Sequence, residues 1–423
     1  MKKRLATLVL VAAVLTPALA VSSPAAGDQP SPKAVVDWSF NAQRAIVGMA
    51  GFFPGDAAVL MGIVHVAIYD AVVAVEGGAR PYAIRPAVPP GASAEVATAT
   101  AAHRVLIGLL PELQPDLDAT YAGYVSAYPD GPARAGGIAV GEEVAAGILA
   151  LRADDGTDDG VPYGQTPPGP GVFEPTAPFP PVGTHVGEIE PLTLPRADLF
   201  RLPGPPPLRS AHYARDFAEV AARGRIDSPV RSPQETAVAR FWNDHGVAQW
   251  NGALHRLIDT HHLTLVQAAR LLAMAHASGG DGMIACFAAK YEHRFWRPIH
   301  AIRRAGTDGN DRTAPDPTWT SLLPTPNHPE YPAAHTCHSG AVAAAITMFF
   351  GTDRVAITVD SRVTGETRHY DRLSAAIAQI IDARILGGIH FRFSGEDGAT
   401  LGSRVGRFAS TRFPPTSRPP HQT

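Results

Sequence analysis

The chain has few cysteines, few alternating strand patterns and no block of basic residues. Its 423 residues include only Cys286 and Cys337, which argues against a disulfide-rich scaffold and leaves either one bridge or two free thiols. Acidic and basic residues nearly balance, at 39 and 36, for a formal charge of −3. Because Lys and Arg do not cluster, we expect neither a nucleic-acid interface nor a basic membrane-binding surface.

The first twenty residues have the pattern of a secretory signal peptide. Three basic residues open the chain, and an apolar run follows that ends in the small-residue cleavage pattern Ala18-Leu19-Ala20. Cleavage there would move the formal charge from −3 to −6, because three basic residues and no acid lie in residues 1–20. We therefore expect a secreted, extracellular protein in which the Ser-, Pro- and Ala-rich residues 21–34 form a disordered linker.

The remainder of the sequence predicts an all-α fold, a large helical bundle in two blocks. Apolar residues recur at spacings of three and four in residues 35–151 and again in residues 210–413. Between them, residues 152–209 are rich in Pro, Gly and Asp and predict a long irregular connection, and residues 414–423 form a tail.

Residues 57–75 are nearly long enough to span a membrane. They contain His65 and Asp70, however, and ionisable groups inside a membrane span are costly. We therefore expect a buried helix there and no integral membrane segment in the mature chain.

Three short motifs in the second block carry groups that bind anions. In "KYEHRFWRP", Lys290 and Arg297 are seven residues apart, about 700° around a helix, so both would project from one face. In "HPEYPAAH", Pro332 stiffens the approach to His335, which precedes a long apolar helical pattern. Free N–H groups at a helix start favour an oxyanion, and a histidine there can move protons.

The third motif is "ARILGGIHF", in which His390 follows Arg384 by six residues. A guanidinium holds oxyanions through paired donors, and an imidazole nitrogen can bond to phosphorus or a metal oxyanion. Taken together, three cations and two histidines suit a tetrahedral or trigonal-bipyramidal oxyanion: the cations neutralise its oxygens, one histidine bonds its centre, and the other handles protons.

The order K-x6-R-P, P-x-x-H and R-x5-H resembles the vanadium-dependent haloperoxidase and type 2 phosphatidic acid phosphatase superfamily, in its secreted bacterial form. The resemblance implies an α-helical enzyme that binds vanadate, or phosphate in its place, through His390. Lys290, Arg297, Arg384 and the backbone N–H of Ala334 would then hold the oxygens. His335 would be the acid/base for hydrogen peroxide, which oxidises a halide. The resemblance leaves a homodimer open.

The chain departs from the family pattern at several positions. The Ser and Gly before the motif histidine are Ala333 and Ala334, the Ser before Arg384 is Ala383, and the acid four residues after His390 is Ser394. In the phosphatases of the family that acid orients the histidine. Its replacement therefore favours a peroxidase, unless Glu396 or Asp397 takes over.

Three further residues are candidates for the surroundings of this site: His328, His338 and Ser394. Bromoperoxidases of the family tend to carry a histidine seven residues before the acid/base histidine, where this chain has His328. The resemblance thus favours bromide as the halide. Two alternatives stay open: a secreted acid phosphatase that hydrolyses phosphate monoesters through a phosphohistidine, and a non-catalytic oxyanion-binding protein, with which the alanine replacements are compatible.

Overall fold

The computed structural model describes residues 31–157, 159–164 and 167–414. The expected signal peptide, most of the linker 21–34 and nearly all of the tail 414–423 lie outside the described residues. The first helix begins at Lys33, so the last two residues of the expected linker belong to that helix.

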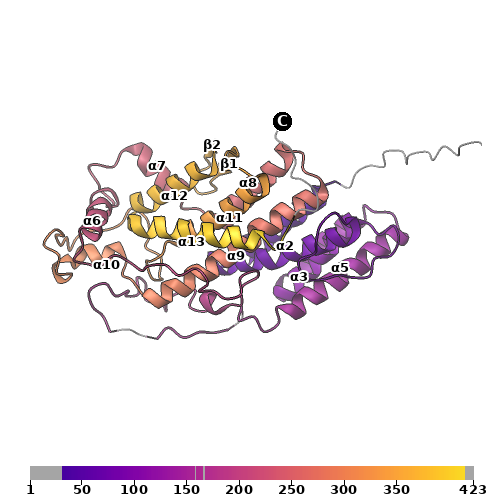
Figure 1. Cartoon of the computed structure of the whole chain (residues 1–423), viewed down its shortest axis with the longest axis horizontal. Coiled ribbons are helices and arrows are strands. Elements are labelled where there is room, and N and C mark those ends of the chain that lie inside the picture. The colour runs from indigo at the N-terminus through magenta and orange to yellow at the C-terminus, as the bar shows by residue number, and fades with distance from the viewer. Residues whose placement is uncertain (1–30, 158, 165–166, 415–423) are drawn as a thin grey trace, which may run out of the picture.

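The prediction of an all-α fold is confirmed (Figure 1). The N-terminal block contains five α-helices: α1 (Lys33–Gln43), α2 (Pro54–Glu76), α3 (Ala94–Leu109), α4 (Gln114–Val125) and α5 (Pro132–Leu151). A π-helical segment, Arg44–Met49, follows α1, and a 3-10 turn, Pro111–Leu113, follows α3.

The C-terminal block contains the other helices: α6 (Ala211–Arg223), α7 (Pro233–Phe241), α8 (Gly246–Thr260), α9 (Leu265–His293), α10 (Pro298–Arg303), α11 (Ala334–Phe350), α12 (Leu373–Leu386) and α13 (Arg392–Ser410). A 3-10 turn, Ala305–Thr307, follows α10. The only sheet in the described residues is an antiparallel hairpin of β1 (Ile357–Asp360) and β2 (Thr367–Tyr370), in which Ile357 pairs with Tyr370.

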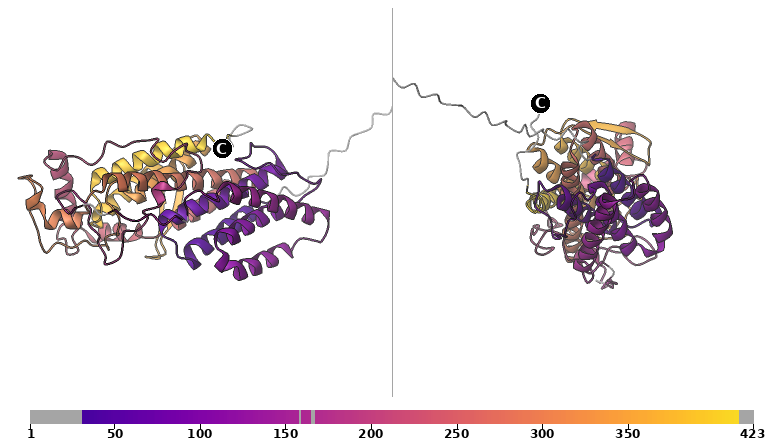
Figure 2. Two further views of the ribbon diagram at one scale, coloured as in Figure 1. Left: turned by 90° about the horizontal axis from the view of Figure 1, so that it is seen from below. Right: turned by 90° about the vertical axis from the view of Figure 1, so that its right-hand side faces the viewer.

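The long helix α9 joins the two blocks, packing against α2 of the first block and against α11 and α13 of the second. Figures 1 and 2 show α9 along the long axis of the molecule, with the N-terminal helices on one side of it. Helix α2 is long and apolar enough to cross a membrane, but 89% of its most apolar window is buried inside the protein. Such all-round burial explains why its sequence lacks a polar face.

Serine side chains cap the N-termini of two helices in the C-terminal block. Ser210 accepts a hydrogen bond from the backbone of Tyr213 and caps α6. Ser232 and Glu235 form a reciprocal capping box at α7. Both satisfy N–H groups that the first turn of a helix leaves free.

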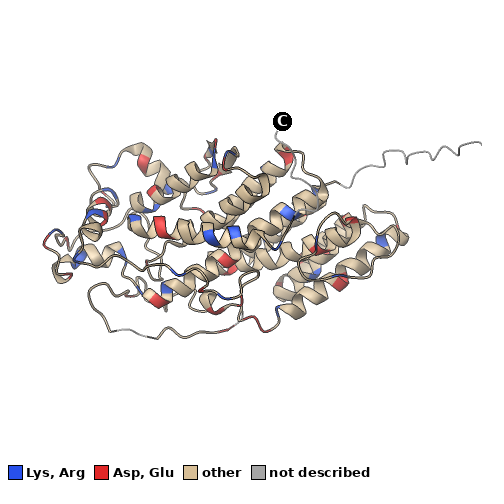
Figure 3. Cartoon of the chain, in the orientation of Figure 1, with Lys and Arg blue, Asp and Glu red and all other residues tan. Residues whose placement is uncertain are grey.

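The irregular connection after α5 runs along the lower edge of the molecule in Figure 1 and contains one 3-10 turn, Val186–Glu188. The buried carboxylate of Asp281 on α9 anchors it by accepting backbone hydrogen bonds from Leu192, Thr193 and Leu194 at 2.7, 2.9 and 3.1 Å. The two leucines are buried, whereas Phe179 of the same connection is 55% exposed. Acidic and basic residues are interspersed along the helices rather than separated by sign (Figure 3).

Helices α11 and α13 approach each other closely through glycines on α13. A Cβ atom at Gly402 would collide with the backbone carbonyl of Cys337, and one at Gly406 would collide with that of Ala341. Because α11 carries His335 in its first turn and α13 begins just after His390, this close approach brings the two predicted catalytic histidines to the same end of the bundle.

We expect Gly402→Ala to lower the free energy of unfolding by about 1–3 kcal/mol or more, because the added methyl group forces α11 and α13 apart. Gly252→Ala on α8 is the matched control, since a Cβ there meets no atom within 4 Å. It should instead stabilise the helix slightly, by roughly 0.5–1 kcal/mol. Urea denaturation of both variants measures the difference, and equal stabilities would contradict the packing described.

Candidate active site

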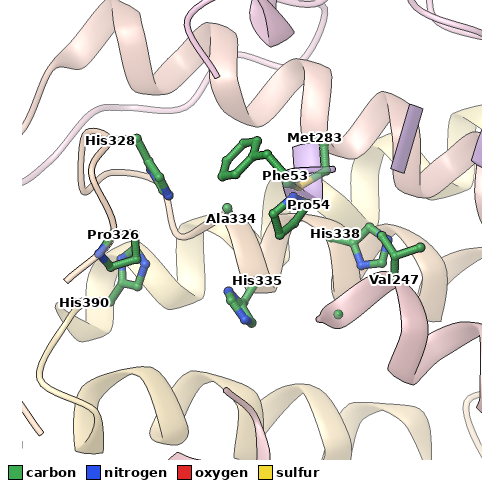
Figure 4. A pocket seen from close by; sticks show the side chains of 11 residues that line it. Phe53, Pro54, Val247, Met283, Pro326, His328, Ala334, His335, His338 and His390 are labelled. Carbon is green, nitrogen blue, oxygen red and sulfur yellow. The ribbon is translucent and has the colours of Figure 1, made fainter. Parts of the chain in front are cut away.

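A cavity of about 230 Å³ lies where the N-termini of α2, α8 and α11 meet the loop before α13. Five of the residues singled out in the sequence line it (Figure 4): His328, Ala334, His335, His338 and His390. Phe53, Pro54, Val247 and Met283 make most of the remaining wall apolar. The structure thus brings together side chains that are up to 62 residues apart in the predicted motifs, from His328 to His390.

Lys290 is in the last turn of α9 and is fully buried. Its ammonium group donates hydrogen bonds to the carbonyl oxygens of Pro329 and Glu330 at 2.7 and 3.0 Å. These contacts fix the side chain but do not neutralise its charge. Burial lowers the pKa of Lys290 from 10.5 to about 8, because the charged form loses its hydration.

Arg297 and Arg384 are also buried. The prediction that Arg297 shares a helix face with Lys290 is wrong, because α9 ends at His293 and Arg297 is the extended N-cap residue of α10. Arg297 donates to the carbonyl oxygens of His328 and Ile389 at 2.8 and 2.9 Å, and Arg384 donates to that of Trp242 at 2.9 Å. The Nε of Arg384 has no hydrogen-bond partner among the described residues. Burial lowers the pKa of both guanidinium groups from their usual value.

Two of the three cations, Lys290 and Arg297, have the same carboxylate nearby. Glu330 is the acid whose charge raises the pKa of Lys290 and of Arg297, and no ion pair links Arg384 to a carboxylate in the part of the chain that is described. Buried charges are stable only when they are paired. An excess of buried positive charge beside a cavity therefore indicates a site for an anion.

Glu330 also orients His390, a role that sequence reasoning missed. Its Oε1 accepts hydrogen bonds from Nδ1 of His390 at 2.8 Å and from the backbone of Phe391 at 3.0 Å. Because Nδ1 carries the proton, the lone pair of His390 is on Nε2, and Arg297 approaches that atom with an N–H group at 3.3 Å. Burial raises the pKa of Glu330 to about 7, while Arg297 and Lys290 oppose the rise.

The acids proposed from the sequence to replace the family acid are in other positions. Glu396 is exposed, and Asp397 accepts a hydrogen bond from the hydroxyl group of Tyr331 at 2.7 Å. Ser394 is buried, with its hydroxyl group 3.4 Å from the backbone carbonyl oxygen of Glu330. The carboxylate that contacts His390 therefore comes from the loop before α11 rather than from α13.

His335 faces the cavity from the first turn of α11 (Figure 4). Burial, together with the charge of Arg384, holds its pKa well below 6.5, although a contact with the Asp244 carbonyl opposes the shift. The imidazole is therefore neutral at pH 7 and can accept a proton. The neighbouring N-terminal residue of the helix, Ala334, presents a backbone N–H group at an end that no side chain caps.

Cys286 and Cys337 are both buried and free in the structure. Cys286 is four residues before Lys290 on α9, and its thiol faces the carbonyl oxygen of Pro332 at 3.8 Å. Of the two alternatives that the sequence left open, the structure has the two free thiols.

Comparison with known proteins identifies this architecture. Residues 270–415 match the model of the VCPO second helical-bundle domain. The chain is 26% identical over 183 residues to a vanadium chloroperoxidase of Curvularia inaequalis, a match that covers 35% of this chain and only 29% of the chloroperoxidase. The fold is that of the vanadium haloperoxidases.

Two solved haloperoxidase structures match over nearly the whole fold. A bacterial vanadium-dependent iodoperoxidase superposes with a TM-score of 0.79 and 23% identity, covering 93% of this chain and 99% of that one. A bacterial vanadium-dependent chloroperoxidase in its holo form gives a TM-score of 0.68 and 16% identity, and the match covers 92% of this chain and 98% of that one. At these identities the likeness concerns the haloperoxidase fold.

The residues present fit the oxyanion that a haloperoxidase would bind. Vanadate and phosphate are tetrahedral anions, and the buried Nε of Arg384, which has no partner among the described residues, is a donor available for such an anion. The lone pair on Nε2 of His390 is the available nitrogen ligand. A negatively charged group would also offset the excess positive charge of the three buried cations.

The pKa of Lys290 predicts how oxyanion affinity depends on pH. Below about pH 8 the ammonium group is charged and attracts the anion, whereas above it the group is neutral. Tungstate is a suitable probe, because this tetrahedral dianion keeps one charge state across this range. We expect its affinity to decrease modestly through pH 7, where Glu330 gains its negative charge, and to fall about tenfold per unit above pH 8, where Lys290 loses its positive charge.

Calorimetric titration between pH 6 and 9.5 measures this dependence. Lys290→Met should bind tungstate more weakly throughout and lose the decrease near pH 8. A wild-type affinity that does not change across this range would contradict the assignment of Lys290 to the anion site.

The contact between Glu330 and His390 predicts a selective effect on vanadate. Glu330→Ala removes the acceptor that holds Nδ1, so the bond from Nε2 should weaken, and loss of such a partner typically costs about 10–100-fold in affinity. Phosphate bound only through the cations should keep its affinity or gain some, because a negative charge has been removed. The ratio of vanadate to phosphate dissociation constants is therefore the measurement.

Two further variants test the geometry of this contact. Glu330→Gln keeps an acceptor oxygen and should retain most of the preference for vanadate over phosphate. In the double variant Glu330→Ala/Ser394→Asp, the acid is moved to the position that the family uses. Part of the preference for vanadate over phosphate should then return. Equal losses for vanadate and phosphate in Glu330→Ala would assign Glu330 a structural role only.

Proposed function

We propose that this chain is a vanadium-dependent haloperoxidase that oxidises a heavy halide, bromide or iodide, with hydrogen peroxide. The observation that carries the proposal is the buried group of three cations beside a histidine whose Nε2 lone pair is contacted only by an N–H group of Arg297 in the described structure. The fold shared with haloperoxidases supports it, as does the match of residues 270–415 to their second helical-bundle domain.

The residues would divide the work as follows. Lys290, Arg297 and Arg384 neutralise the oxygens of the bound vanadate, and the N–H group of Ala334 adds a donor at the start of α11. Nε2 of His390 is the nitrogen ligand. Vanadate, when bound, supplies a Lewis-acidic centre that activates hydrogen peroxide towards the halide.

His335 is the acid/base in this proposal. One ring nitrogen contacts the Asp244 carbonyl, and the other accepts a proton from hydrogen peroxide. The ring later returns that proton to the departing oxygen atom. The low pKa of the buried ring suits the first step, since the ring is unprotonated at neutral pH.

The preference for bromide or iodide rests on the wall of the cavity. His328 lines it with its ring between Phe53 and Phe287, at centroid distances of 5.9 and 5.2 Å. A largely apolar wall favours large anions, because the cost of removing an ion from water falls as its radius grows. The solved iodoperoxidase with this fold agrees with such a choice.

A phosphatase is the second candidate, and one observation favours it. The sequence argument against it was the replacement of the orienting acid by Ser394, yet Glu330 holds Nδ1 of His390 in the way that a phosphohistidine mechanism needs. Phosphate and vanadate would use the same cations. Only turnover distinguishes the two activities.

We also propose that the protein is exported, on the pattern of residues 1–20, which lie outside the described residues. Export would place the oxidant outside the cell.

Paired assays on the purified protein test the function. After loading with vanadate, we expect oxidation of bromide and iodide by hydrogen peroxide. His390→Ala should lose both vanadate binding and oxidation. His335→Ala should keep vanadate but lower kcat by about a hundredfold or more, as removal of an acid/base group does.

A vanadate-free sample given a phosphate monoester is the comparison. Hydrolysis that vanadate inhibits, without halide oxidation, would make the phosphatase correct. Absence of both activities in a folded protein that binds vanadate would favour the non-catalytic oxyanion-binding alternative.

A further inference from the structure

The cavity has two ends that differ in chemistry. In Figure 4, His390 and His328 lie at one end, His338 and Val247 lie at the other, and His335 lies between them. Burial lowers the pKa of His390, and the charges of the three buried cations lower it further. The end near His338 is formed by the first turn of α8 and by apolar side chains, and the oxyanion site does not use it.

His338 is a polar side chain at the second end with no partner in the described structure. It is 5% exposed, it lines the cavity, and neither of its ring nitrogens has a hydrogen bond to another described residue. Its Nδ1 faces the first residue of α8: a Cβ built on Gly246 would lie 3.7 Å from this atom. A buried imidazole without a hydrogen bond costs free energy, so the group has a donor to offer to a ligand.

The N-terminus of α8 faces the same space. Gly246 and Val247 line the cavity, and the N-cap residue, His245, makes no side-chain capping bond. The backbone N–H of Gln249 bonds within the helix, but those of Gly246 and Val247 have no partner among the residues described. A helix of 15 residues therefore begins here, and the positive end of its dipole has no side-chain cap.

One acid is close to this end of α8, and its charge is already balanced. The carboxylate of Asp244 accepts the backbone N–H of His245 at 2.6 Å and forms an ion pair with Arg362 at 2.8 Å. Asp244 thus leaves the N–H groups of Gly246 and Val247 available to an anion.

We propose that the halide binds between the N-terminus of α8 and Nδ1 of His338, beside His335; this inference rests on the proposed function and names the site of its substrate. Two backbone N–H groups and one imidazole N–H would hold the ion. Val247 and Met283 supply apolar contact, which suits bromide and iodide better than the more strongly hydrated chloride. The halide would then lie on the side of His335 opposite His390.

The first test locates the ion. Vanadate-free crystals soaked in sodium bromide should give an anomalous scattering peak in contact with the backbone nitrogens of Gly246 and Val247 and with Nδ1 of His338. A peak only elsewhere in the cavity, or none, would overturn the proposal. This experiment needs no catalysis, so it stands even if halide oxidation is not found.

The second test separates halide binding from the other steps. Gly246→Ala should fold normally, because the nearest atom to its Cβ is the imidazole nitrogen at 3.7 Å, yet the methyl group would occupy the space of the ion. We expect the KM for bromide and iodide to rise about tenfold, as for the loss of one hydrogen bond to an anion. The KM for hydrogen peroxide and the vanadate affinity should not change.

Gly252→Ala on the same helix is the control, since its Cβ meets no atom within 4 Å. His338→Ala should raise the halide KM like Gly246→Ala, whereas His261→Ala, at the exposed opposite end of α8, should not. An unchanged halide KM in both site variants would contradict the proposal, as would an effect confined to an organic acceptor substrate. If halide oxidation is absent from the wild type but the bromide peak is present, the proposed function fails and the anion site remains.

Discussion

The active site depends on keeping three cations buried beside a single carboxylate. Lys290 is on α9, Arg297 directly precedes α10 and Arg384 is on α12, and backbone carbonyl groups hold each of them in place. Carbonyl dipoles orient the charges but do not cancel them, so the lowered pKa of Lys290 expresses an unfavourable arrangement that a bound oxyanion relieves. The same excess of buried positive charge therefore destabilises the free protein and attracts the anion.

Packing in the rest of the fold holds the three buried cations in place despite their mutual repulsion. A rigid frame must hold like charges together against their repulsion, and the glycine contacts between α11 and α13 let those helices pack backbone to backbone. Helix α9 carries Lys290 in its last turn and is buried for most of its length against both blocks. The N-terminal block then closes the cavity with Phe53 and Pro54 at the start of α2.

Local patterns in the sequence were sufficient to predict the helical blocks and the motif residues that meet at the cavity. Contacts between distant segments were not predictable in this way. Glu330 is 60 residues before His390, whereas the substitute acids that the sequence indicates, Glu396 and Asp397, are close to His390 along the chain. The one local hint was an acid between Pro329 and Pro332, in a loop otherwise built of apolar and imidazole groups.

The position of Glu330 also changes which part of the site decides the reaction. If the carboxylate behind His390 serves a vanadate ligand and a phosphohistidine equally well, then neither it nor the cations distinguish a peroxidase from a phosphatase. In the proposed arrangement, the difference lies beyond His335, where a phosphate ester would place its leaving group and a haloperoxidase its halide. There the chain offers apolar side chains, an uncapped helix and the partnerless His338 within the described structure. A small polarisable anion satisfies all three, whereas an ester alkyl group would leave the N–H donors of α8 and His338 buried without a partner.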